Sequence, residues 1–202
     1  AEHAEKFYEE NRENGISLCI SKMSYTYHNG TKVFMRADFE AHPHEIVALV
    51  GPSGEGKTTL LRIMLALLHI QRGDEDLVGA KTGEVLTITP AARRLFSYVP
   101  QGNTMFSGTI AENMRNVRPD ATDEEIKEVL IVSCAWEFVQ KLPDGIYSKV
   151  GERGGGFSEG QAQRLSIAWA LLRRAPILLL EEATSALDVA TERRVLKNIM
   201  QT

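Results

Sequence analysis

Apolar and polar residues alternate near the start of the chain, and this period of two predicts extended structure. The alternation begins over residues 16–20, a His-Asn-Gly turn signal follows at residues 28–30, and residues 32–35 resume it. We therefore expect a hairpin-like β unit. Residues 1–15 are polar and charged, and we expect them to form a frayed helix, a tail or a linker.

A strand, a glycine-rich turn and a helix are predicted next. Residues 46–50 are apolar and β-branched, which is typical of a buried strand, and an apolar helical pattern follows from residue 57 to about residue 70. Short strands are expected at residues 76–78 and 84–87. A short helix that begins with Pro and a strand stopped by Pro100 follow; they cover residues 90–95 and 96–99.

The pattern then becomes helical. Between residues 106 and 146 the sequence carries no strand signal, and Thr122 with Glu125 matches a capping box. Ser158 is an N-cap candidate for a helix that ends before Pro176. The remaining expected elements are a buried parallel strand and a final helix with Thr184 or Asp188 near its start; the strand covers residues 177–180.

Composition and charge narrow the class of protein. The chain has 202 residues, 43% of them hydrophobic, and a net charge of −4 without a dense Lys/Arg block, so nucleic acid is not an expected partner. The apolar run at residues 60–70 is too short to span a bilayer. Cys19 and Cys134 match no metal or redox spacing and are expected to be reduced and buried. A chain that begins at Ala1 and stops inside a helical pattern suggests a domain of a larger protein.

The glycine-rich turn carries the clearest chemistry. It reads Gly51-Pro52-Ser53-Gly54-Glu55-Gly56-Lys57-Thr58, which is the pattern G-x-x-x-x-G-K-[ST] between a strand and a helix. The glycines let backbone N–H groups approach an anion, and the helix N-terminus adds partial positive charge. Lys57 is expected to reach the β- and γ-phosphates of a nucleotide, and the Thr58 hydroxyl to hold Mg²⁺. The alternative is a glycine-rich turn without a ligand.

Other candidate residues are less specific. Tyr27 either stacks on an adenine ring or packs as a strand tyrosine, and Gln101 either contacts the site at a strand end or is simply solvated. Residues 151–161 form a second glycine-rich segment that opens a helix, and it is either an anion site or a linker. Glu181 and Glu182 at the tip of an apolar strand either coordinate a metal and activate water or are solvated.

The order of these features resembles the nucleotide-binding domain of an ATP-binding-cassette (ABC) transporter, over residues 16–202. We call residues 157–161, Phe-Ser-Glu-Gly-Gln, the signature segment, because its Ser-x-Gly-Gln element matches the family's signature just before the acidic strand. Residues 107–113 and 151–154 further resemble the exporter-type branch.

The resemblance implies an α/β fold. A P-loop NTPase (RecA-like) core, over residues 16–105 and 161–202, would carry an N-terminal antiparallel β subdomain and an inserted α-helical subdomain at about residues 106–160, and would be shortened at its C-terminus. Such a domain would power an exporter by ATP-dependent head-to-tail dimerisation. Its partners would be a second nucleotide-binding domain and the transmembrane domain, at the cytoplasmic face of a membrane.

The resemblance also implies roles for single residues. Glu182 would be the catalytic base, with Gln101 and Lys57 also catalytic, and Asp188 would lie at the dimer interface. Mg²⁺ would be held by Thr58, Gln101 and Glu181. ATP would contact two groups of residues, the second of them from the opposite subunit: Tyr27, Gly51, Pro52, Ser53, Gly54, Glu55, Gly56, Lys57, Thr58 and Thr59; then Ser158, Gly160 and Gln161.

Three departures from the family pattern leave alternatives open. Glu181 stands where the family has Asp, Glu159 stands where it has Gly, and the family's switch His has no counterpart, since all five histidines precede the acidic strand. One alternative is therefore a nucleotide-binding module with weak or no hydrolysis. The other is a soluble ABC ATPase acting on DNA or the ribosome, although that class carries a long coiled coil or a second cassette.

Overall fold

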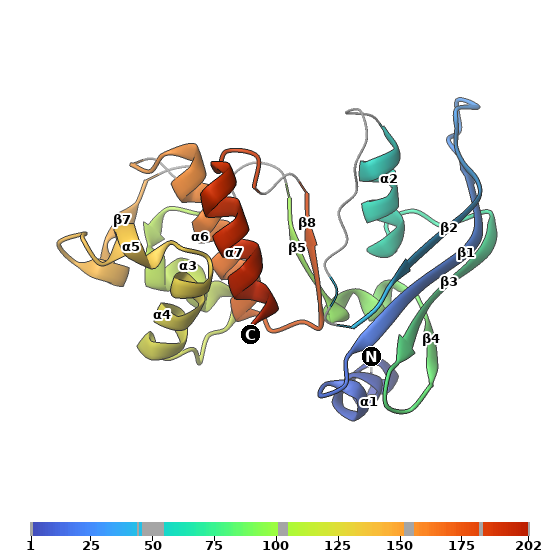
Figure 1. The fold of residues 1–202 in the computed structure, drawn as a ribbon, viewed down its shortest axis with the longest axis horizontal. Helices are drawn as coiled ribbons and strands as arrows, with labels where there is room; N and C mark the ends of the chain where they lie inside the picture. The colour runs from blue at the N-terminus through green and yellow to red at the C-terminus, as the bar shows by residue number, and fades with distance from the viewer. Residues whose placement is uncertain are drawn as a thin grey trace. The chain divides into compact units, whose positions relative to one another are not determined.

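The computed structural model describes residues 2–43, 45, 55–100, 105–151, 156–181 and 184–201. The chain divides into two compact units, residues 1–96 and 97–202. Both contain helices and strands (Figure 1), so the expectation of a mixed α/β fold is confirmed. The predicted strand at residues 46–50 lies outside the described residues.

The first unit is built on a four-stranded antiparallel sheet with the strand order β2-β1-β3-β4. The hairpin expected near the start of the chain forms one side of the sheet: β1 and β2 pair, and the Tyr27 N–H donates to the Thr31 carbonyl at 2.9 Å across the turn. The apolar face of β1 is buried because its alternate side chains point to the same side of the sheet. The strands are β1 (Ile16–Thr26), β2 (Lys32–Ala41), β3 (Arg72–Gly79) and β4 (Val85–Thr87).

The N-terminal segment, expected as a frayed helix or a tail, is largely a helix, α1 (Glu2–Asn11), and this helix is packed rather than frayed. Phe7 and Asn11 are fully buried, and α1 lies against β3. The Asn11 side chain accepts hydrogen bonds from the backbone N–H groups of Lys81 and Thr82, both at 3.1 Å. These partners follow Asn11 by about seventy residues, so the local polar composition gave no sign of them.

The helix after the glycine-rich turn, α2 (Glu55–Met64), is shorter than the pattern up to residue 70 predicted. Its C-terminal carbonyls need partners outside the helix. The N–H groups of Leu65, Ala66 and Leu67 donate to the carbonyls of Leu61, Ile63 and Arg62. Arg93 holds the turn that follows the helix, since its guanidinium donates to the carbonyls of Leu65 and Ala66 at 2.6 and 3.0 Å. Ala66 has a φ of +54°, which ends the helical path.

Glu75 on β3 is a buried acid in the first unit, only 7% exposed. Its Oε2 atom has no hydrogen-bond partner among the described residues. Burial, and secondarily the charge of Asp76, raises the pKa of Glu75 from 4.5 to about 7. Ionising this buried carboxyl opposes folding, so the unit loses stability as the pH rises from 4.5 towards 7.

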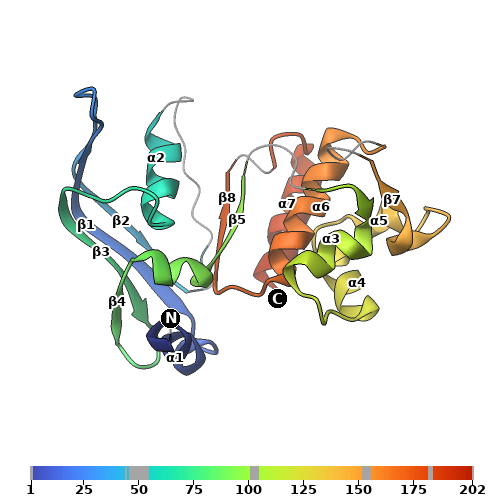
Figure 2. The same cartoon turned by 180° about the vertical axis from the view of Figure 1, so that it is seen from behind.

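The second unit is mainly helical. Helix α6 packs against α3 and α4 around an apolar core (Figure 2). The helices are α3 (Ile110–Val117), α4 (Asp123–Val132), α5 (Trp136–Val139), α6 (Glu159–Leu172) and α7 (Val189–Met200). The predicted capping box of Thr122 and Glu125 is confirmed at the start of α4, and Asp188 caps α7.

Short segments complete the two units: η1 (Pro90–Leu95), β5 (Phe96–Val99), β6 (Gly108–Thr109), η2 (Gly145–Tyr147), β7 (Lys149–Val150) and β8 (Ile177–Leu180).

The expectation of no strand between residues 106 and 146 is wrong at β6. This strand has two residues and exists through its pairing with β7, so it is too short to show a periodic pattern. On β8 only Leu179 is buried and the other three residues are half-buried.

Candidate functional site

The start of α2 carries the described part of the glycine-rich turn. Helix α2 begins at Glu55, which places Gly56, Lys57 and Thr58 in its first turn. The N–H groups of a first helical turn have no partner inside the helix and carry partial positive charge. This end of α2 is therefore suited to bind an anion. Gly51, Pro52, Ser53 and Gly54 lie outside the described residues.

Tyr27 lies at the end of β1 and reaches α2 within the same unit. Its hydroxyl and the Thr59 Oγ1 atom are 2.6 Å apart, and Thr59 is fully buried. The Tyr27 ring meets the Tyr25 ring edge-on, with centroids 5.1 Å apart. Tyr27 thus packs in the fold and touches the predicted phosphate-binding helix, while adenine stacking stays a prediction.

The signature segment opens α6 with a capping box. The Gln161 N–H donates to the Ser158 Oγ atom at 3.1 Å, and the Ser158 N–H donates to the Gln161 Oε1 atom at 3.0 Å. The predicted N-cap is confirmed. At Gly160 a Cβ atom would lie 3.0 Å from the Ala186 carbonyl oxygen, so a larger residue would press on the turn before α7.

Glu181 follows β8 directly, as the sequence predicted for an acid at a strand tip. Its N–H donates to the Val99 carbonyl at 2.9 Å, and its carboxylate accepts a hydrogen bond from the Tyr98 hydroxyl. Strand β5 therefore positions this half-buried acid from two sides. Gln101 and Glu182 lie outside the described residues.

Asp188 accepts a hydrogen bond from the Thr191 N–H at 2.7 Å. This backbone bond is the main cause of a lowered Asp188 pKa, because it stabilises the ionised carboxylate. At neutral pH Asp188 is therefore a charged cap at the start of α7.

Sequence reasoning missed two supporting residues. Tyr98 carries no pattern that marks it. Gln163 is a buried polar residue on α6 whose amide donates to the Ser185 hydroxyl and accepts from the Ala186 N–H, both at 3.0 Å. It joins the signature helix to the turn before α7. A polar residue inside an otherwise apolar helix face was the available signal.

Comparison with known families now identifies the chain. The model of the family described as ABC transporter matches residues 34–185. The chain belongs to the ABC transporter family. The match covers about three quarters of the chain, including the glycine-rich turn, the signature segment and both strand-tip acids.

Individual relatives agree with the family. The chain is 37% identical over 196 residues to a Rickettsia conorii protein that carries the name export ATP-binding/permease protein. The alignment covers 96% of this chain and 34% of that protein. It is 41% identical over 180 residues to the mitochondrial iron-sulfur clusters transporter ATM1 of Candida albicans. That alignment covers 89% of this chain and 24% of the transporter. The chain thus spans a third or less of the length of these relatives.

A solved structure confirms the predicted P-loop NTPase fold. The structure of a bacterial Atm1-family ABC exporter with ATP bound aligns with a TM-score of 0.80 at 31% identity, covering 93% of this chain and 32% of that chain. This similarity confirms the family resemblance read from the sequence.

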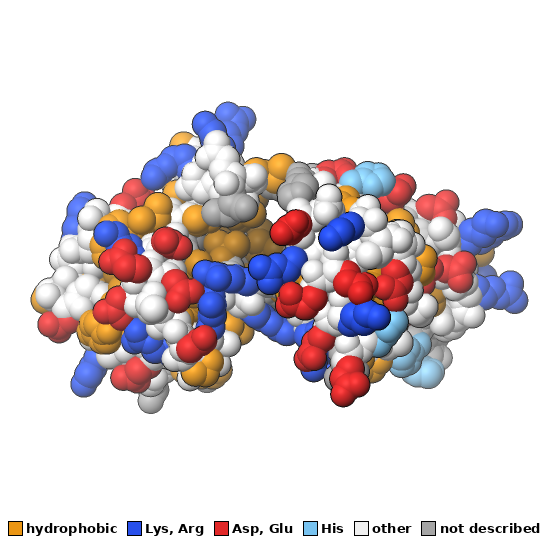
Figure 3. All heavy atoms as spheres, turned by 90° about the horizontal axis from the view of Figure 1, so that it is seen from below, with side chains coloured by type: hydrophobic (Ala, Val, Ile, Leu, Met, Phe, Trp, Pro, Cys, Tyr) orange, Lys and Arg blue, Asp and Glu red, His pale blue; other side chains and the backbone are white. Residues whose placement is uncertain are grey.

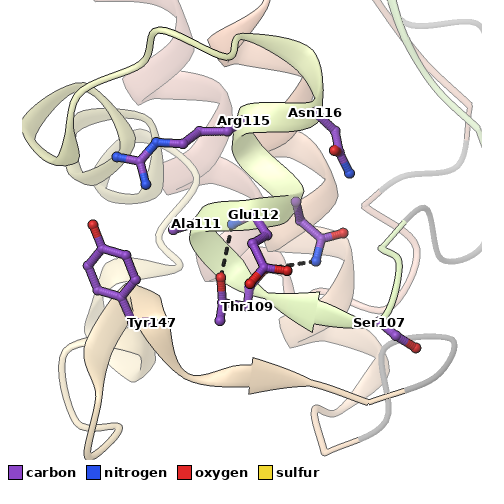
Figure 4. A pocket seen from close by; sticks show the side chains of 8 residues that line it. Ser107, Thr109, Ala111, Glu112, Arg115, Asn116 and Tyr147 are labelled. Carbon is purple, nitrogen blue, oxygen red and sulfur yellow. Dashed lines mark hydrogen bonds between the residues drawn. The ribbon is translucent and has the colours of Figure 1, made fainter.

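A separate pocket of about 490 Å³ lies in the second unit of this ABC protein. In Figure 4, Thr109 caps α3, with its Oγ1 atom accepting from the Glu112 N–H at 3.0 Å. At the other side the Tyr147 hydroxyl and Arg115 both donate to the Asp123 carboxylate at 2.7 Å. Among the described residues, none that is predicted to bind nucleotide lines this pocket.

The surface shows no dominant charge on the face drawn in Figure 3, where acidic and basic side chains are mixed on each unit.

Within the described ranges, no helix combines the length and hydropathy needed to cross a bilayer. The same residues contain no cluster of three metal-ligating His, Cys, Asp or Glu side chains. Both cysteines are unpaired thiols; Cys134 is buried and Cys19 is half-buried.

Proposed function

We propose that this chain binds and hydrolyses ATP, and that ATP-dependent head-to-tail pairing of two such domains powers an ABC exporter. The observation that carries the proposal is the start of α2, where Lys57 and Thr58, the last two residues of the G-x-x-x-x-G-K-[ST] pattern, occupy the first helical turn. The family match over residues 34–185 supports it, as does the fold of an ATP-bound exporter.

ATP binding is assigned first to the glycine-rich turn and to Tyr27. Residues 51–59 would cradle the phosphates with backbone N–H groups, Lys57 would neutralise charge on the β- and γ-phosphates, and Tyr27 would cover the adenine. Thr58, Gln101 and Glu181 fit Mg²⁺, because a hydroxyl, an amide carbonyl and a carboxylate are hard oxygen donors. When bound, Mg²⁺ supplies positive charge to the phosphate oxygens.

Hydrolysis requires two copies in this proposal. Glu182 would orient water for in-line attack, and Gln101 would contact the same water. Ser158, Gly160 and Gln161 of the opposite domain would contact the γ-phosphate. Support comes from the capping box, which holds the N-terminus of α6 in a defined conformation.

A weakly hydrolysing module is the second candidate, and Glu181 favours it. Its carboxylate already accepts the Tyr98 hydroxyl, and it is one methylene longer than the family's Asp. Mg²⁺ tolerates little departure from octahedral geometry. We expect Glu181→Asp to raise turnover; an unchanged or lower rate would show that the longer acid does not limit hydrolysis.

The partners follow from the relatives. Two of them are named as an export permease protein and a mitochondrial transporter, and both are about three to four times as long as the part matched here. We propose that a transmembrane domain receives the work of ATP hydrolysis and that this domain lies at the cytoplasmic face of a membrane. The mixed surface charge and net charge of −4 argue against nucleic acid.

Steady-state ATP hydrolysis against protein concentration tests the proposal, with Mg²⁺ in excess. A rate that rises faster than linearly and is abolished by Lys57→Ala would support a composite site that forms by dimerisation. Glu182→Gln should trap a dimer on size-exclusion chromatography with ATP and Mg²⁺. ATP binding without turnover would favour the second candidate, and absence of ATP binding would reject both.

A further inference from the structure

We propose that Arg164 is a positioning residue that holds the signature segment in place through Glu137 and Phe138. Arg164 lies on α6, one turn after Gly160. The inference rests on the proposed function, since it assigns Arg164 a role in presenting Ser158 and Gln161 to nucleotide.

The polar contacts of Arg164 join three parts of the second unit. Its NH1 atom donates to the Cys134 carbonyl at 3.0 Å and to the Glu137 carboxylate at 2.7 Å. Its Nε atom donates to the Gly160 carbonyl at 3.4 Å. The Arg164 side chain is only 15% exposed, while that of Glu137 is 46% exposed, so the guanidinium is the shielded member of this ion pair. One guanidinium therefore ties the signature segment to the loop and helix around α5.

Ring contacts hold the residue before Ser158, Phe157. The Arg164 Cζ atom lies 4.9 Å from the centroid of the Phe138 ring, within cation–π range. The Phe138 and Phe157 rings are 5.7 Å apart and tilted by 54°. Phe157 directly precedes Ser158. The segment is thus held at Phe157 through the rings and at Gly160 through the hydrogen bond, with the capping serine between them.

The geometry favours a positioning role over general stability. Arg164 is a planar donor that pairs, stacks and reaches a carbonyl at the same time, which a lysine cannot reproduce fully. Glu137 has a second partner, Arg194 on α7, at 3.4 Å. Arg194 is 58% exposed and supplies a matched control, because replacing it weakens the pairing of Glu137 while the contacts of Arg164 stay in place.

Hydrogen exchange of the chain without nucleotide is the first test. We expect Arg164→Gln to speed amide exchange in peptides covering residues 157–163 by about tenfold, because the change removes the ion pair, the bond to the Gly160 carbonyl and the ring contact that hold this turn. Glu137→Gln should give a smaller increase, Arg164→Lys should restore part of the protection, and Arg194→Gln should match wild type. Unchanged exchange in Arg164→Gln, or equal increases in Arg164→Gln and Arg194→Gln, would overturn the proposal.

ATP kinetics provide the second test. Arg164→Gln should lower kcat by about tenfold while the affinity of the isolated chain for a fluorescent ATP analogue is unchanged, because the phosphate loop is intact. A parallel loss of nucleotide affinity and thermal stability would show a merely structural role and overturn the inference. If wild type binds no nucleotide, the proposed function fails, while the exchange test still decides whether Arg164 positions the segment.

Discussion

Helices α4 and α6 begin with the same capping device, in which a hydroxyl at the N-cap pairs with Glu at the third helical position of α4 and with Gln at that of α6. At α4, Thr122 and Glu125 exchange two hydrogen bonds of 3.2 Å between side chain and backbone. At α6, Ser158 and Gln161 exchange the same two bonds at 3.0 and 3.1 Å. The geometry is shared, so the difference is the charge of the residue at the third helical position.

The two charges suit two different tasks. Glu125 is ionised and compensated, since Arg118 and Arg174 both lie 3.0 Å from its Oε2 atom. Gln161 makes the cap without adding a negative charge, so the N-terminus of α6 keeps more of its partial positive charge. The comparison teaches that a capping box stabilises a helix in either form, but only the amide form leaves that helix end attractive to a phosphate.

The largest expected effect comes from making the two boxes alike. Gln161→Glu retains the capping geometry and places a carboxylate where the γ-phosphate of a partner's ATP is proposed to bind. We expect ATP turnover to fall by about 100-fold, in the range of losing one transition-state donor, with no loss of thermal stability. The matched control is Glu125→Gln, for which turnover should stay at the wild-type level; equal losses in both variants would refute the distinction.

Removing the capping hydroxyls separates stability from function. Ser158→Ala and Thr122→Ala should each destabilise the unit by about 1 kcal/mol, because each leaves an N–H group of the first turn without its acceptor. Turnover should fall by about tenfold only in Ser158→Ala, since only this hydroxyl is proposed to contact nucleotide. Thermal unfolding and ATPase rates measured on both variants give the comparison directly.

A smaller effect is expected at Glu159, the one acid in the first turn of α6. Its side chain is exposed, so its charge is largely screened. Glu159→Gln should raise turnover by about twofold by removing a negative charge near the helix N-terminus. The KM for ATP and kcat, measured at low salt where screening is weakest, provide the check; a lower kcat would contradict the expected repulsion.

The smallest expected effect is on the stability of the fold at low pH. The bond from the Thr122 backbone, followed by the attraction of nearby arginines, lowers the Glu125 pKa below its ordinary 4.5. Ionised Glu125 therefore favours the folded state above pH 4.5, and this contribution is lost as the pH falls through the lowered pKa. At neutral pH Glu125→Gln should lower Tm by about 2–4 °C. Melting curves at decreasing pH should converge with those of wild type; a constant difference would contradict this assignment.

The sequence predicted best what neighbours in the chain determine. The caps at Thr122 and Ser158 depend on residues three positions away, and both were predicted. At the start of α7 the sequence left Thr184 and Asp188 open, and Asp188 is the cap. The phosphate-loop helix and the acid at Glu181 followed from similarly local patterns. Most site residues could therefore be proposed individually from the sequence.

What the sequence did not predict depends on distant partners. Arg164 meets a carbonyl thirty residues away, and β6 exists because of β7. The turn after α2 is held by Arg93, which follows the carbonyls it binds by 27 and 28 residues. No periodicity or composition encodes such pairs in a single sequence.

The buried contact between Asn11 and Thr82 also has a consequence for biosynthesis. Helix α1 leaves the ribosome before its hydrogen-bonding partners, which are synthesised about seventy residues later. At ordinary translation rates, about 4–14 s therefore pass before Phe7 and Asn11 can pack in the folded unit. During that interval the nascent helix exposes an apolar face, which makes it a natural contact for chaperones acting on the growing chain.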